Sequence, residues 1–209
     1  MKADLSHPVL EAIRGRTSSN HFDPAARLDE VTIRLLVAHA TEAPSAYNFQ
    51  NWRFIAVQSA SRKQQLKEAA YGQQKVADAA VTFIVCGRLR PHEGLRAAME
   101  PFITLGHVDE DAVTAMVDDA TATYAEDASM QRDEAVRSAS LAAMSLMIAA
   151  EALGLASAPL GGFDPDAVHE SFGLEEADLP VLLVAVGVKA AGNWPRKPRR
   201  KVDQVLTIV

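Results

Sequence analysis

The chain has 209 residues, 48% of them hydrophobic, and a formal net charge of −6. Its length suits one domain with a sizeable core, and its negative charge argues against a general nucleic-acid binder, whose surface is basic. A single cysteine, Cys86, excludes an internal disulfide or a cysteine-based metal cluster. Because Cys86 lies in an apolar run, we interpret it as a small buried hydrophobe rather than a redox thiol.

The sequence predicts a soluble, cytoplasmic protein with no membrane partner. Residues 1–10 lack the long apolar stretch of a secretory signal. The most apolar helical stretch, residues 139–150, is shorter than the ~20 residues that a bilayer span needs.

The first half of the chain shows clear starts and stops for helices and strands. Pro8 suits the first turn of a helix that follows Ser6, Pro44 stops a second helix, and Ser61 is a suitable N-cap for a third. In chain order we predict a helix ending near Arg14, a helix over 30–43, a strand over 54–58, a helix from Ser61 to Ala70, and a buried strand over 80–86.

The second half begins with residues 91–132, which are acidic and weakly periodic and predict one or two helices. A helix over 134–153, apolar nearly all round, ends before Gly154. Asp164-Pro165 opens a short helix that Gly173 closes. A second apolar strand follows over 180–188, and the basic tail from 190 becomes β-like over 205–209.

Three or four strands separated by helices predict α/β or α+β layers in a single domain, 1–209, with helices on both faces of the sheet. We assign 91–132 as a lid or insert and 190–209 as a C-terminal arm. The apolar helix over 134–153 has more apolar surface than a small monomer hides, which predicts a dimer.

Four segments have the composition of ligand-binding loops. The polar loop 44–54 joins a helix to a strand, and the residues Arg16-Thr17-Ser18 offer charge-assisted and hydroxyl donors to a phosphate. The Gly161-Gly162 pair lets backbone approach a ligand, and the tail adds a basic run over 196–201. Taken singly, these segments are also compatible with a solvated helix end, a tight turn, or a solvated or nucleic-acid-binding basic run.

Taken in order, the four segments resemble the nitroreductase family, a group of small FMN-dependent oxidoreductases, over about 8–87 and 135–206. Loop 44–54 is similar to the family's P-S-S-x-N-x-Q-P-W-x-F, residues 16–22 to R-R-S-x-R-x-F, 159–163 to P-x-G-G-F, and 197–199 to K-x-R. Thr17 and Asn20 stand where the family has basic residues, and Asn51 replaces a proline. Arg200 or Lys201 is expected to restore the missing charge. The resemblance implies that FMN is bound by Arg16, Thr17, Ser18, Asn20, Ser45, Ala46, Asn48, Gln73, Pro159, Leu160, Gly161, Gly162, Lys197 and Arg199.

The resemblance also implies an α+β fold with a central mixed sheet, a swapped C-terminal arm and a homodimer with FMN at its interface. The expected activity is reduction of a small-molecule acceptor, such as a nitroaromatic or a quinone, by NAD(P)H, with no catalytic side chain. Phe102 and Tyr124 of the lid are expected to contact the acceptor, and we prefer Tyr124. Another reaction on the same scaffold (reductive dehalogenation or flavin fragmentation) or a flavin-binding sensor or carrier are the alternatives.

Other chemistries lack their sequence signatures. There is no G-x-G-x-x-G, P-loop or H-E-x-x-H motif, and the six histidines are scattered, so we expect no metal site. A Ser-His-Asp hydrolase stays open, although no G-x-S-x-G frames a serine.

Overall fold

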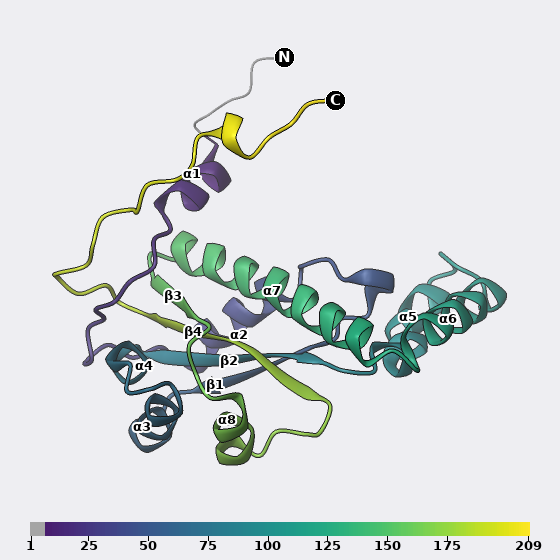
Figure 1. Cartoon of the computed structure of the whole chain (residues 1–209), viewed down its shortest axis with the longest axis horizontal. Coiled ribbons are helices and arrows are strands. Elements are labelled where there is room, and N and C mark those ends of the chain that lie inside the picture. The colour runs from purple at the N-terminus through teal and green to yellow at the C-terminus, as the bar shows by residue number, and fades with distance from the viewer. Residues whose placement is uncertain (1–6) are drawn as a thin grey trace.

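The computed structural model describes residues 7–209 and contains a four-stranded sheet between layers of helices (Figure 1). The strands are β1 (Trp52–Val57), β2 (Val81–Arg88), β3 (Ala156–Leu160) and β4 (Asp178–Gly187). The helices are α1 (Pro8–Gly15), α2 (Glu30–Ala40), α3 (Ala60–Ala69), α4 (Gln74–Asp78), α5 (Leu95–Thr104), α6 (Glu110–Tyr124), α7 (Ala128–Ala152) and α8 (Pro165–Phe172), with 3₁₀ turns η1 (Ala46–Asn48), η2 (Pro91–Gly94) and η3 (Val202–Gln204).

The sheet has the order β1-β2-β4-β3, and every neighbouring pair is antiparallel. The parallel contact expected of a mixed sheet is limited, in the described part of the chain, to an isolated bridge between Ser18 and Ser157. β2 and β4 are central and largely buried, whereas β1 and β3 form the two edges. The outer edge of β1 therefore keeps backbone groups available for further pairing, whereas the outer edge of β3 is met by the bridge at Ser157.

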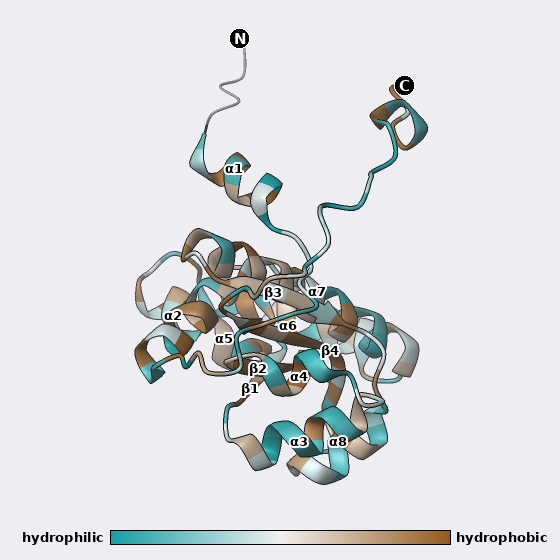
Figure 2. Ribbon diagram, turned by 90° about the vertical axis from the view of Figure 1, so that its left-hand side faces the viewer, coloured by the Kyte–Doolittle hydropathy of each residue, from teal (hydrophilic) through white to brown (hydrophobic). Residues whose placement is uncertain are grey.

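Alternation along β2 builds a hydrophobic core on each face of the sheet. Val81, Phe83 and Val85 point to one face and pack in a cluster with residues of α2 and α7. Ile84 and Cys86 point to the other face, where α3 and α8 supply the cover. Figure 2 shows this arrangement as hydrophobic central strands with largely hydrophilic ribbon on the outer helices α3 and α8. The predicted cover on both faces is confirmed.

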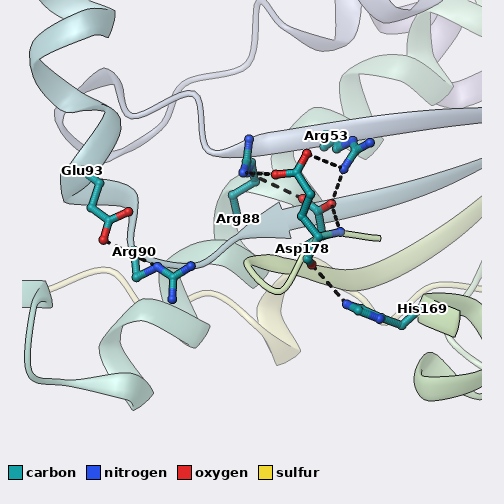
Figure 3. A network of polar contacts seen from close by, with 7 residues as sticks. Arg53, Arg88, Arg90, Glu93, His169 and Asp178 are labelled. Atoms are coloured by element: carbon teal, nitrogen blue, oxygen red, sulfur yellow. Dashed lines mark hydrogen bonds and ion pairs between the residues drawn. The ribbon is translucent and has the colours of Figure 1, made fainter. Parts of the chain in front are cut away.

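A network of ion pairs joins β1, β2 and β4 at one end of the sheet (Figure 3). The buried carboxylate of Asp178 pairs with Arg53, and it lies 3.6 Å from Nε of Arg88. Glu175 accepts from the same two guanidinium groups. Because the network ties three strand ends together, we assign it a structural role.

Several predicted boundaries hold and others shift. Asp164 caps α8, and Gly173 ends it in the left-handed region at φ 60°, as predicted. Helix α3 is capped by Ser59 rather than Ser61, because the hydroxyl of Ser59 accepts from the amide of Arg62. Helix α2 ends at Ala40, three residues before the predicted Ala43.

Helix α7 has 25 residues and begins at Ala128 rather than Glu134. By length and composition alone it is apolar enough to cross a membrane, but its packing against α2, β2 and β4 identifies it as the central helix of the core. The early start reflects the side chain of Asp127, which accepts from the amides of Ser129 and Met130.

The prediction of a β-like tail over 205–209 is wrong for the single chain. The tail forms the turn η3 and then irregular structure, and residues 201–209 are exposed. Figure 1 shows the tail leaving the body, away from the edge of the sheet. A strand needs a neighbour for its backbone groups, and no strand among residues 7–209 pairs with the tail.

Candidate functional site

The two ends of the chain meet beside the edge strand β3. The segment that follows α1 pairs with β3, and the amide of Ser19 donates to the carbonyl of Ser157 at 3.0 Å. The segment that follows β4 returns alongside through a bridge between Phe22 and Lys189. Residues far apart in the sequence are therefore neighbours at this edge.

Asn193 and Arg196 hold these two segments together. The side-chain oxygen of Asn193 accepts from the amides of Asn20 at 2.6 Å and His21 at 3.0 Å, and its nitrogen donates to the carbonyl of His21 at 2.8 Å. The guanidinium of Arg196 donates to the carbonyl of Arg16 at 2.6 Å and to that of Arg14. A pocket of about 270 Å³ lies between these two segments, α4 and β3. It is lined by Thr17, Ser18, Asn20, Lys75, Pro159, Trp194, Pro195, Arg196, Lys197 and Arg199.

The pocket is strongly cationic, and no carboxylate is among the described residues that line it. Arg16 adjoins the pocket through its neighbour Thr17, and its Nη1 is buried without a hydrogen-bond partner among the described residues. Burial, followed by the charges of Arg196 and Arg199, lowers the pKa of Arg16. Burial likewise lowers the pKa of Lys75, with Lys197 as the second cause.

These observations describe a site built for an anion with several negative charges. Buried cations with unused donors are unfavourable unless a counter-charge is bound. Guanidinium donors beside the hydroxyls of Thr17 and Ser18 match the oxygens of a phosphate. The residues present therefore fit the phosphate of a nucleotide-type cofactor.

The structure brings most of the predicted site residues to this one edge. Thr17, Ser18, Asn20, Pro159, Lys197 and Arg199 all line the pocket. Gln73 lies nearby and donates to the carbonyl of Gly162 at 2.7 Å. Gly161 and Gly162 are exposed at the end of β3, whereas Leu160 is 3% exposed and its side chain belongs to the core.

The predicted loop residues Ser45, Ala46 and Asn48 do not line this pocket within the described chain. They lie in and beside η1, which packs against α5 of the lid. Tyr47, Asn48 and Gln50 have φ values of 51°, 60° and 49°, an uncommon conformation for residues other than glycine. Within one protomer, this loop therefore lies apart from the cationic pocket.

The two lid residues expected to contact an acceptor differ in exposure. Tyr124, the preferred one, is 4% exposed, and its ring packs edge-on against Phe49 at 5.3 Å. Phe102 is 50% exposed near the end of α5. Of the two, the exposed Phe102 is better placed for a contact with a ligand.

Sequence reasoning missed Lys75, Trp194 and Arg196 as pocket residues. Lys75 approaches Asn20, with 3.4 Å between Nζ and Oδ1, so it supplies a cation next to the position where the family motif has one. The expected substitutes, Arg200 and Lys201, do not line the pocket. The position of Arg196 in the basic run 196–201 could have predicted its place in the pocket. Lys75 is the one cation of its segment, 71–79, so the sequence offered no such signal for it.

Comparison with known proteins identifies the family. Residues 13–188 match the model of the Nitroreductase family, so the chain belongs to this family. The Bacillus subtilis protein named "Putative NAD(P)H nitroreductase YodC" is 30% identical over 93% of this chain and 97% of its own length.

Solved structures share the fold. The "putative nitroreductase ydfN" of Bacillus subtilis superposes with a TM-score of 0.90 at 27% identity, covering 95% of this chain and 97% of its own. A "putative nitroreductase in complex with FMN" from Exiguobacterium sibiricum has a TM-score of 0.87 at 24% identity, covering 100% of this chain and 99% of its own.

Proposed function

We propose that the protein is an FMN-dependent oxidoreductase of the cytoplasm that uses NAD(P)H to reduce small acceptors such as quinones and nitroaromatics. The family assignment and the names of its relatives support an NAD(P)H-dependent activity. The observation that carries the proposal is the cationic pocket beside β3. Next to this pocket, the buried Nη1 of Arg16 has no hydrogen-bond partner among the described residues.

Each group of residues has a separate task in this proposal. Arg16, Lys197 and Arg199 hold the phosphate of FMN, while the hydroxyls of Thr17 and Ser18 donate to its oxygens. Pro159 and the backbone of Gly161-Gly162 would contact the ring of FMN, and Gln73 orients that backbone through the carbonyl of Gly162. When bound, FMN supplies the hydride-transfer chemistry, so the side chains bind and orient rather than act as nucleophiles.

We further propose a homodimer, because two surfaces of the protomer have no partner among residues 7–209. The tail has exposed apolar side chains, among them Val205, Leu206 and Ile208. β1 is an open edge strand beside an apolar trough that includes Ile33, Val37, Phe54 and Phe83. A tail docked on the partner's β1 edge would cover both surfaces, and a dimer would let loop 45–50 reach the partner subunit's cofactor.

The activity is tested by isolating the protein with its bound flavin and adding NADH or NADPH without oxygen. Loss of the yellow absorbance, followed by its recovery on addition of a quinone, is the expected result. Colour without loss of absorbance would indicate a flavin carrier, and failure to bind FMN would refute the proposal.

The assembly is tested by light scattering of the full chain and of a chain that ends at Lys201. We expect the full chain at twice 22.5 kDa and a substantial monomer fraction after truncation. A full chain that scatters as a 22.5 kDa particle at micromolar concentration would contradict the dimer.

A further inference from the structure

The lid and loop 45–50 (Ser45–Gln50) form one packed body, separate from the two cores on the sheet. Phe49 of the loop is 5% exposed and lies inside the hydrophobic cluster of the lid. The centroid of its ring lies 5.2 Å from that of Tyr47 and 5.3 Å from that of Tyr124 on α6. The other buried members of this cluster come from α5 and α6: Leu95, Met99, Val113 and Ala120.

The backbone of the loop is held in an unfavourable conformation. Tyr47, Asn48 and Gln50 occupy the left-handed region, where the Cβ of an L-residue crowds the following carbonyl. Such conformations persist only when surrounding contacts determine them. One contact lies within the loop, where the amide of Gln50 donates to the hydroxyl of Ser45 at 2.9 Å.

In addition to the packing of Phe49, a side-chain hydrogen bond reaches across to the lid. The phenol of Tyr47 donates a hydrogen bond to the carboxylate of Asp119 on α6, 72 positions further along the chain. This charge-assisted bond raises the pKa of Tyr47. The adjacent Asp118 is equally exposed but has no hydrogen-bond or ion-pair partner among the described residues.

We infer that Asp119 is a positioning residue for the cofactor: through Tyr47 it holds loop 45–50 in the left-handed conformation that presents Asn48 to FMN. The inference rests on the proposed function, in which this loop contacts the flavin of the partner subunit. In this inference the lid supports the cofactor site as well as covering it. Asp119 belongs to α6 of the lid, and it acts on the cofactor only through the loop.

The test compares single and double variants of the full chain. Asp119→Ala and Tyr47→Phe each remove the bond, Asp119→Asn keeps an acceptor oxygen, and Asp118→Ala removes the same charge one residue away. The measurements are the dissociation constant of FMN by fluorescence titration of the apoprotein, and kcat and KM with menadione as acceptor.

We expect Asp119→Ala and Tyr47→Phe each to raise the dissociation constant severalfold, up to about tenfold, because the released loop must be ordered again when FMN binds. The dissociation constant of the double variant Tyr47→Phe/Asp119→Ala should equal that of each single variant, because both changes remove the same bond. The dissociation constant of Asp119→Asn should lie within about threefold of the wild-type value, since a neutral acceptor retains part of the bond. Additive effects in the double variant, or equal effects of Asp119→Ala and Asp118→Ala, would overturn the inference.

Arg16→Ala, measured in parallel, separates this inference from the proposed function. Weaker FMN binding in Arg16→Ala with unchanged binding in Asp119→Ala refutes only the positioning role. Wild-type protein that binds no FMN refutes both.

Discussion

The sharpest test of the cofactor site is Arg16→Ala. Arg16 is half-buried, and its Nη1, beside the cationic pocket, has no hydrogen-bond partner among the described residues. A hydrogen bond to a charged group contributes roughly 1.5–3 kcal/mol, and ~1.4 kcal/mol is a factor of ten in affinity. We therefore expect the dissociation constant of FMN to rise by about ten- to a hundredfold.

The same substitution should not weaken the apoprotein. Burial and the nearby charges of Arg196 and Arg199 lower the pKa of Arg16, which means that the charged form is held at a cost when no anion is bound. Glu151 raises the pKa of Arg16, but its effect is smaller than that of burial or of either arginine. We expect an unchanged or slightly higher melting temperature without FMN.

Arg200→Ala provides the matched control, because it removes an equal charge from an exposed tail residue outside the pocket lining. An exposed charge contributes about 0–1 kcal/mol, so its effect on FMN affinity should stay below about fivefold. Fluorescence titration of both apoproteins at equal ionic strength makes the comparison. Equal losses in the two variants, or no loss in Arg16→Ala, would refute the phosphate site.

Three further expectations concern packing, the thiol and the acceptor. A Cβ at Gly87 would lie 2.2 Å from the carbonyl oxygen of Ala135, so urea unfolding of Gly87→Ala should show a loss of ~1–3 kcal/mol of stability. A Cβ at Gly94 meets open space, so Gly94→Ala should change the stability by less than ~0.5 kcal/mol. Similar losses in the two variants would contradict this packing. Burial raises the pKa of Cys86 to about 12, so a thiol reagent at pH 8 should label only the unfolded chain. The contribution of this thiol to stability should fall as the pH rises above 9.0, where the thiol of the unfolded chain ionises. Rapid labelling of the native protein would contradict the burial of Cys86. Phe102→Ala should raise the KM for menadione severalfold at full FMN content, whereas lost FMN with an unaltered KM would show that Phe102 supports the scaffold.

The sequence by itself determined the elements that depend on neighbouring residues. Asp164-Pro165 and Gly173 delimit α8 because capping and left-handed closure are local interactions. The apolar strands were recognisable for the same reason, since a run buried on both faces shows in its own composition. The order of four short motifs was sufficient to predict the family and the residues on the N-terminal side of the pocket.

Only the tertiary structure decided which distant groups meet. It placed Lys75 against Asn20. It also brought Arg196 into the pocket beside Lys197 and Arg199, because Asn193 and the β3 edge determine where the two ends of the chain cross. It also buried Tyr124 under Phe49, and it gave residues 205–209 no strand to pair with in the described part of the chain. Contacts of this kind depend on packing and backbone pairing between segments far apart in the sequence, and no local pattern of residues encodes them.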